Sequence, residues 1–196
     1  MDYLAKDIRN VCLIGHKGNG KTSLAEAMLF FAKATDRLGK TESGNTVCDY
    51  DAEEIKRKIS ISLAAAPFTY KNTKINIIDT PGFYDFEGEQ IAALSVADTA
   101  LIVLSAKTTV SVVTEKAVKN CTDLKIPFAF FINGLDDENA DFYKTLEQLW
   151  QKFNSTSIIP MQLPLVSGGK VIGIVDILTG TAYKYDGAAR TKCDIP

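Results

Sequence analysis

The residues best suited to chemistry lie near the start of the chain, where Gly15–Thr22 reads GHKGNGKT. This spacing fits the pattern G-x-x-x-x-G-K-[ST], and it stands between an apolar run and a helix-like segment. Glycines let the backbone turn tightly and direct several N–H groups at an anion, and the new helix directs its positive end there too. Lys21 can reach outer phosphates and Thr22 offers a hydroxyl to Mg²⁺, so the stretch predicts a nucleotide phosphate site. A dinucleotide fingerprint is not supported, because Ser23 stands in place of its third glycine.

A second motif, NIIDTPG, places Asp79 at the end of an apolar run and Gly82 three residues later. A carboxylate at the carboxyl end of a neighbouring strand can hold magnesium directly or through water. The N–H of Gly82 is free to approach a terminal phosphate, which would make it a sensor of that phosphate. We therefore expect Lys21 and Gly82 to act on the reacting phosphate.

A third motif, FAFFINGLD, ends another apolar run with Asn133 and Asp136. A carboxylate accepts two hydrogen bonds from the N1–H and 2-amino group of guanine, whereas adenine presents an acceptor there. The usual form of this motif is N-K-x-D, and Gly134 stands at the lysine position. The sequence thus predicts a preference for guanine with reduced affinity.

These motifs need a scaffold of alternating strands and helices. Apolar runs at 10–15, 60–70, 74–79, 99–106 and 127–134 predict strands, the second and third joined by the turn at 71–73. Helical patterns occupy 23–33, 89–97, 114–124 and 137–153, and we expect a long loop at 36–60. The prediction is an α/β protein with a P-loop NTPase three-layer fold and a mostly parallel sheet. After about residue 154, strands around the turn at 167–169 predict a small added subdomain, followed by a polar, unpatterned end.

Composition and charge bear on the partners and the compartment that we expect. The chain has 196 residues, 46% of them hydrophobic, and a formal net charge of −2. This charge offers no general attraction to nucleic acid or acidic lipid, and we expect no sequence-specific DNA binding. Four scattered cysteines favour reduced thiols over a disulfide framework or zinc site. No apolar run reaches the roughly 18 residues that span a bilayer and no signal peptide is evident, so we expect a cytoplasmic protein without a membrane contact. We also expect a monomer.

With three motifs in order, the chain resembles the translational GTPases, and within them elongation factor G. The stretch DYDAEEIKRKISI at 49–61 resembles the first switch of that family, and DTPGFYDFEGE at 79–89 resembles the second. VIGIVDILTGTAYKY resembles the start of the subdomain inserted in that family's GTPase domain. The resemblance implies a GTPase domain at 1–155 and the start of the insertion at 156–196. It also implies GTP, GDP and Mg²⁺ as ligands and the ribosome as a partner through a longer protein.

The resemblance carries roles to particular residues of this chain. The nucleotide-binding set that we expect is His16, Lys17, Gly18, Asn19, Gly20, Lys21, Thr22, Ser23, Asn133 and Asp136. The expected magnesium set is Thr22, Ser60 and Asp79, with serine where the family has threonine. Lys58 stands where the family has glycine.

Two departures from the family bear on activity. Phe83 occupies the position of a histidine that positions the attacking water, and phenylalanine cannot orient water by hydrogen bonding. Together with Gly134 this resembles a divergent elongation factor G-like branch. The late S-A-[LK] loop that contacts guanine is also absent, so we expect this chain to be a piece of a longer protein. We expect nucleotide binding and hydrolysis by this piece to be weak.

Three functional classes remain open at this point. The first is a GTP-binding switch domain that hydrolyses GTP slowly. The second is a guanine-nucleotide-binding regulatory module that does not hydrolyse GTP, suggested by Phe83. The third is a P-loop ATPase or small-molecule kinase, which would need an adenine pocket in place of Asn133 and Asp136.

Overall fold

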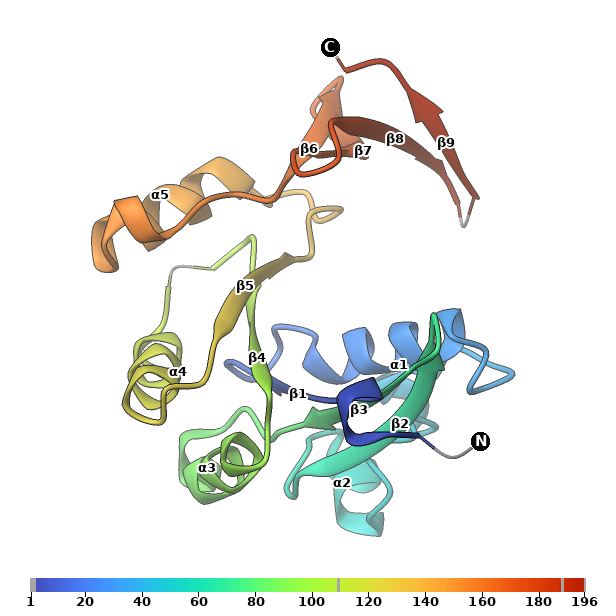
Figure 1. Ribbon diagram of the computed structural model, residues 1–196, viewed down its shortest axis with the longest axis vertical. Helices are drawn as coiled ribbons and strands as arrows, with labels where there is room; N and C mark the ends of the chain where they lie inside the picture. The colour runs from blue at the N-terminus through green and yellow to red at the C-terminus, as the bar shows by residue number, and fades with distance from the viewer. Residues whose placement is uncertain (1–2, 109, 188, 196) are drawn as a thin grey trace. The chain divides into compact units, whose positions relative to one another are not determined.

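A computed structural model describes residues 3–108, 110–187 and 189–195 (Figure 1). The chain divides into two compact units. The described residues of Met1–Ser105 and Val110–Asn133 form the first, and those of Ala106–Thr109 and Gly134–Pro196 form the second. Each unit is considered by itself below.

The first unit contains a five-stranded sheet in the order β2-β3-β1-β4-β5. Its strands are β1 (Ile8–Ile14), β2 (Ala64–Tyr70), β3 (Thr73–Asp79), β4 (Thr99–Ser105) and β5 (Phe128–Asn133). Only β2 runs antiparallel, through a hairpin to β3 whose turn residues Lys71 and Asn72 both have positive φ. Pro67 is tolerated in β2 because that strand lies at the sheet edge. The parallel strands all end at one edge, so the carboxyl ends of β1, β3, β4 and β5 lie along that edge.

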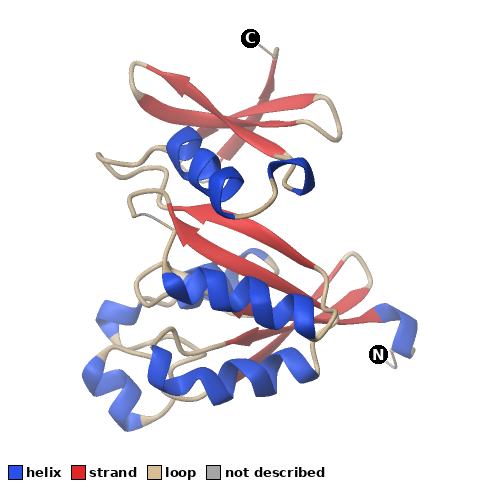
Figure 2. Ribbon diagram, turned by 90° about the vertical axis from the view of Figure 1, so that its left-hand side faces the viewer, coloured by secondary structure: helices blue, strands red, loops and turns tan. Residues whose placement is uncertain are grey.

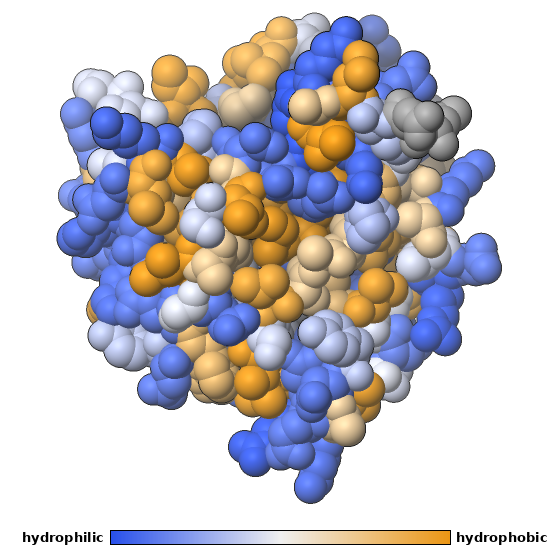
Figure 3. All heavy atoms as spheres, turned by 60° about the horizontal axis from the view of Figure 1, so that its bottom comes forward, coloured by the Kyte–Doolittle hydropathy of each residue, from blue (hydrophilic) through white to orange (hydrophobic). Residues whose placement is uncertain are grey.

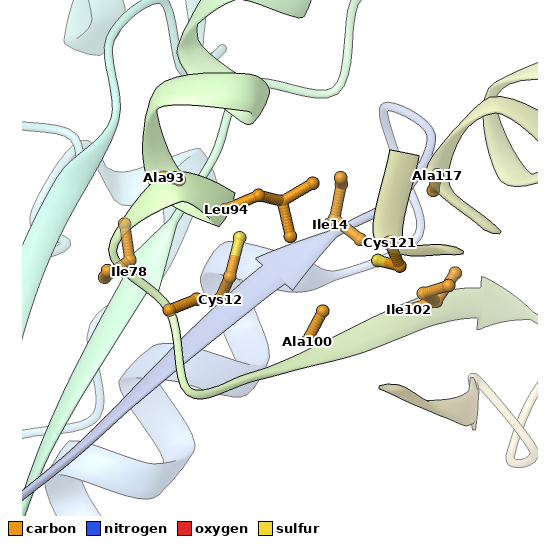
Figure 4. Packing of buried hydrophobic residues seen from close by; sticks show 10 residues of the cluster. Cys12, Ile14, Ile78, Ala93, Leu94, Ala100, Ile102, Ala117 and Cys121 are labelled. Carbon is orange, nitrogen blue, oxygen red and sulfur yellow. The ribbon is translucent and has the colours of Figure 1, made fainter. Parts of the chain in front are cut away.

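Helices cover both faces of this sheet. The helices of this unit are α1 (Lys21–Phe31), α2 (Ala52–Arg57), α3 (Glu87–Ser95) and α4 (Val112–Asp123), with short 3₁₀ turns at Ala5–Asp7, Thr41–Ser43 and Tyr84–Phe86. On one face, α3 and α4 pack on β1, β3 and β4 through small and apolar side chains such as Cys12, Leu94 and Ala117 (Figure 4). On the other, Ala25 and Leu29 of α1 pack against β1, β2 and β3. The expected three-layer α/β fold is confirmed.

The second unit holds α5 (Phe142–Lys152), a 3₁₀ turn at Ser155–Ser157 and a four-stranded antiparallel meander. Its strands are β6 (Gln162–Ser167), β7 (Lys170–Asp176), β8 (Thr181–Asp186) and β9 (Ala189–Cys193), drawn in red in Figure 2. Gly168 and Gly169, both with positive φ, make the turn between β6 and β7. Asp141 caps α5 by accepting the N–H of Lys144, so the helix begins later than its sequence pattern indicated.

Two elements differ from the sequence-based expectations. The segment 36–60 is not a continuous loop, because α2 forms behind a capping box made by Asp51 and Glu54. The polar end of the chain contributes β9, an edge strand whose side chains are mostly exposed and which therefore lacks an apolar pattern. The last division between the two compact units along the chain falls between residues 133 and 134. The domain boundary at 155 remains a prediction.

None of the helices among the described residues combines the length and the apolar character that a membrane span needs. On the face drawn in Figure 3, apolar residues are interspersed with hydrophilic ones.

Candidate functional site

The loop between β1 and α1 has a backbone that only glycine fits at its key points. Gly15, Gly18 and Gly20 all have positive φ, at 150°, 82° and 85°. A side chain on Gly15 would lie 2.3 Å from the Val103 oxygen, and one on Gly20 would lie 2.2 Å from Asn133 Nδ2. The loop is therefore pressed against β4 and the end of β5, in the nest-like form that phosphate binding requires.

Two asparagine side chains hold this loop in place by donating hydrogen bonds to backbone oxygens. Asn19 is buried and its Nδ2 donates to the Val103 oxygen at 2.8 Å. Asn133, at the end of β5, donates from Nδ2 to the Asn19 oxygen at 2.9 Å. Asn133 thus lies against the phosphate loop and braces it.

Lys21 is the buried cation of the site. Its side chain is 6% exposed, and among the described residues no other lysine or arginine is buried. Its ammonium donates to the carbonyl oxygens of Gly15 at 2.9 Å and His16 at 3.3 Å, which places it inside the loop. Burial lowers its pKa, and the carboxylates of Asp79 and Asp49 act in the opposite direction. The ammonium is thus held where it could meet an anion at little further desolvation cost.

A chain of hydrogen bonds links the expected magnesium residues. Thr22 Oγ1 donates to Asp79 Oδ2 at 2.6 Å and lies 3.3 Å from Ser60 Oγ. Ser60 Oγ donates in turn to Asp49 Oδ1 at 2.7 Å. The sequence did not single out Asp49, whose buried carboxylate lies on a loop without a recognisable pattern.

Asp79 fits a role beside a cation. Its Oδ1 is buried and has no hydrogen-bond partner. Burial raises the pKa of Asp79 to about 6, against the opposing effects of the Lys21 ammonium and the Thr22 hydroxyl. An unpartnered anionic oxygen beside two hydroxyls suits a hydrated divalent cation, since Mg²⁺ prefers oxygen ligands and retains waters. Among the described residues, no group of three or more His, Cys, Asp or Glu side chains is arranged to hold a metal ion.

Glu54 positions the segment that carries Ser60. It is 1% exposed, and its Oε1 accepts the N–H groups of Ile61 at 2.8 Å and Ser62 at 3.0 Å. Its Oε2 accepts the N–H of Asp51 at 3.1 Å. One buried carboxylate therefore ties α2 to the residues directly after Ser60. The D-x-x-E spacing of a capping box could have revealed it from sequence.

The second motif comes directly against the phosphate loop. The Lys17 N–H donates to the Gly82 oxygen at 3.1 Å, and a Cβ on Gly82 would lie 2.6 Å from Lys21 Nζ. Phe83, the next residue, is half-buried and packs edge-on against Phe86 with ring centroids 6.5 Å apart. Tyr84 is 58% exposed and its ring faces Lys116 of α4. The Phe83 ring, at the position of the family's histidine, has no hydrogen-bonding group.

The remaining predicted residues have different environments. His16 and Gly18 are exposed on the loop, Ser23 is exposed in the first turn of α1, and His16 Nδ1 lies 2.7 Å from the Lys17 oxygen. Asp136 is exposed in a turn of the second unit, so its pairing with guanine remains a prediction. The first unit therefore brings together the loop, Thr22, Ser60, Asp79, Gly82 and Asn133.

The sequence of the chain is similar to those of known proteins. A family model described as the elongation factor Tu GTP binding domain matches residues 6–190. The chain is 38% identical over 184 residues to an elongation factor G-like protein of Mycobacterium tuberculosis, covering 94% of this chain and 25% of that protein. It is 36% identical over 183 residues to the mitochondrial ribosome-releasing factor 2 of Culex quinquefasciatus, covering 93% and 24%.

A solved structure agrees with the fold. A crystal structure of a protein from Thermus thermophilus superimposes with a TM-score of 0.91 at 36% identity, covering 96% of this chain and 28% of that one. The chain spans about a quarter of the length of the curated relatives it matches.

Proposed function

The chain belongs to the translational GTPases that carry the elongation factor Tu GTP-binding domain, in their elongation factor G-like group, and we propose that it binds GTP and GDP with Mg²⁺ and hydrolyses GTP slowly. The observation that carries the proposal is the convergence of the Lys21 ammonium, Gly82 and the Thr22–Asp79 pair at one edge of the sheet. In this proposal the loop amides hold the phosphates and Asp136 selects guanine.

The residues of the site suggest how hydrolysis would proceed. Water attacks the γ-phosphorus in line with the bond to the β-phosphate oxygen, which leaves with GDP. Lys21 neutralises charge that develops on the phosphate oxygens, and the N–H of Gly82 donates to the γ-phosphate. When the γ-phosphate departs, Ser60 and Gly82 lose a partner, and both switch segments can relax.

Thr22, Ser60 and Asp79 would hold the magnesium ion, the first two through hydroxyls and the third directly or through water. The ion, when bound, neutralises charge on the phosphate oxygens. Asp49 would orient the Ser60 hydroxyl through the hydrogen bond that joins them.

Phe83 supports a second candidate, a guanine-nucleotide-binding module that does not hydrolyse GTP. The ring has no group that can hold the attacking water, and its neighbours are Phe86 and the Lys17 ammonium. Single-turnover assays of the full-length parent protein, with and without ribosomes, separate the two candidates. Turnover stimulated by ribosomes supports the first, and a rate equal to that of buffer supports the second.

Base selection can be tested by exchanging hydrogen-bond donors and acceptors. Titration with labelled nucleotides should give tighter binding of GTP than of ATP. Asp136→Asn should lose GTP and gain xanthosine triphosphate, because an amide can donate to the 2-oxo group of xanthine. The control is Asp137→Asn, whose exposed carboxylate pairs with Lys107 and should leave the preference unchanged. Equal binding of ATP and GTP would contradict the proposal.

We also propose that the longer protein acts on the ribosome and that the chain itself is monomeric and binds no sequence-specific DNA. Its relatives' names support the ribosomal partner. The compartment remains a prediction, since some of these names specify mitochondria.

A further inference from the structure

The second switch segment (residues 79–89) presents two consecutive aromatic rings, and each faces a lysine from a different element. The Lys17 ammonium, from the phosphate loop, lies 4.5 Å from the centroid of the Phe83 ring. The Lys116 ammonium, from α4, lies 3.9 Å from the centroid of the Tyr84 ring. Both distances fall within the range of cation–π attraction, so the ring that replaces the family's histidine has a specific partner.

The two lysines differ in what else surrounds them. Lys116 also pairs with Glu87, at 2.9 Å between Nζ and Oε2. No carboxylate of the described residues forms an ion pair with Lys17, whose ammonium therefore rests on a ring alone. A lysine without an anionic partner, on an exposed residue of a phosphate loop, can take an anionic ligand at little cost.

The backbone of Lys17 lies beside the place proposed for the terminal phosphate. A Cβ on Gly82 would come within 2.5 Å of the Lys17 nitrogen and 2.6 Å of Lys21 Nζ. Gly82 donates to the γ-phosphate in the proposed function, so that phosphate would sit within the reach of a four-carbon side chain at residue 17. An ammonium forms charge-assisted hydrogen bonds with phosphate oxygens, which are stronger than its attraction to a ring face.

We propose that the Lys17 side chain is a ligand of the terminal phosphate, held ready by the Phe83 ring, and that it makes the chain discriminate GTP from GDP. The inference rests on the proposed function and assigns to the side chain a role beyond that of the loop backbone. On binding GTP, the ammonium leaves the ring for the γ-phosphate, and Phe83 loses its tie to the phosphate loop. GDP has no γ-phosphate, so with GDP the ammonium stays on the ring.

The test compares affinities for a non-hydrolysable GTP analogue and for GDP, measured by calorimetry at fixed Mg²⁺. Lys17→Met should weaken analogue binding by about tenfold and GDP binding by less than about twofold. Lys17→Arg keeps the charge and can still lie on a ring, so it should retain most of the discrimination. Lys116→Met is the matched control, because it removes a lysine from a ring of the same segment without changing the phosphate loop, and the affinity ratio should stay constant.

The outcomes separate this inference from the proposed function. If the unmodified chain binds neither guanine nucleotide, the proposed function fails and the role of Lys17 falls with it. If the chain binds both nucleotides but Lys17→Met weakens them equally or not at all, only the inference about Lys17 is overturned.

A second measurement tests the ring without any nucleotide. Lys17→Met, Phe83→Leu and the double variant form a cycle in urea unfolding. A contact of this kind should appear as a two- to fivefold non-additivity in the unfolding equilibrium constant, roughly the 0.5–1 kcal/mol of an exposed cation–π pair. Additive effects would show that the ring does not hold the ammonium and would overturn the proposal.

Discussion

The two switch segments are held in place by different kinds of interaction. The first (residues 49–61) is fixed by buried carboxylates: Glu54 accepts three backbone N–H groups, and Asp49 accepts the hydroxyl of Ser60. The second (residues 79–89) has a buried start at Asp79–Gly82, but its rings at Phe83 and Tyr84 contact an exposed lysine and a half-buried one. Buried hydrogen bonds to a charge are costly to lose, whereas exposed contacts contribute little. Breaking the contacts that hold the first segment should therefore cost more free energy than breaking those of the exposed part of the second.

The largest effect should follow removal of the carboxylate that anchors the first segment. Glu54→Ala leaves three backbone N–H groups without their acceptor and should lower the free energy of unfolding by about 3 kcal/mol, measured in urea. The control is Glu53→Ala, which removes a half-exposed side chain paired with Arg57 and should change it by less than about 0.5 kcal/mol. Equal losses in the two variants would abolish the distinction between the segments.

The free energy of unfolding should depend on pH through Asp79, at the buried start of the second segment. The pKa of Asp79 is raised from 3.8 to about 6, so between these pH values the folded state keeps a proton that the unfolded state has released. Raising the pH therefore favours unfolding. The full stabilisation by this group is present below pH 3.8 and is lost through pH 6.

At about 1.4 kcal/mol per unit of pKa, this loss is on the order of 3 kcal/mol. Asp79→Asn cannot titrate and should lack it. Unfolding of both proteins at a series of pH values, with a chelator and without nucleotide, isolates the difference. Parallel pH curves would mean that Asp79 is ionised at little cost and that the start of this segment is not buried in solution.

Lys58, the residue that ends α2 in the first segment, has an unfavourable backbone conformation. Lys58 follows the helix with φ at 55° and ψ at 44°, a left-handed conformation that glycine adopts without steric cost. Lys58→Gly should raise the free energy of unfolding by about 0.5–1 kcal/mol. Lys56→Gly, inside the same helix, should instead lower it by about 1 kcal/mol. A loss in both variants would contradict the left-handed conformation at Lys58.

The smallest effect is expected in the exposed part of the second segment. Lys116→Met removes the cation over Tyr84 and the partner of Glu87, both on the surface. We expect the free energy of unfolding to fall by less than about 1 kcal/mol, because solvent screens such contacts. A loss as large as that of Glu54→Ala would show that the second segment is held as firmly as the first.

Much of the fold followed from local patterns. The apolar runs predicted β1 to β5, and the glycines with Lys21 predicted the phosphate loop, because strand burial and tight turns leave marks in neighbouring residues. The capping box that begins α2 lies in a charged stretch that has no apolar periodicity to indicate a helix. Strand β9 has no apolar alternation because it lies at a sheet edge.

The sequence by itself determined the order of the motifs and the strands that carry them, since these depend on residue types a few positions apart. Only the tertiary structure decided which distant groups meet: Asp49 with Ser60, Asn133 with Asn19, and Lys17 with Phe83. Such pairs depend on the packing of elements far apart in the chain or on how a loop folds back, and neither leaves a local pattern. The same holds for the pKa of Asp79, which follows from burial that the residue's neighbours in sequence do not reveal.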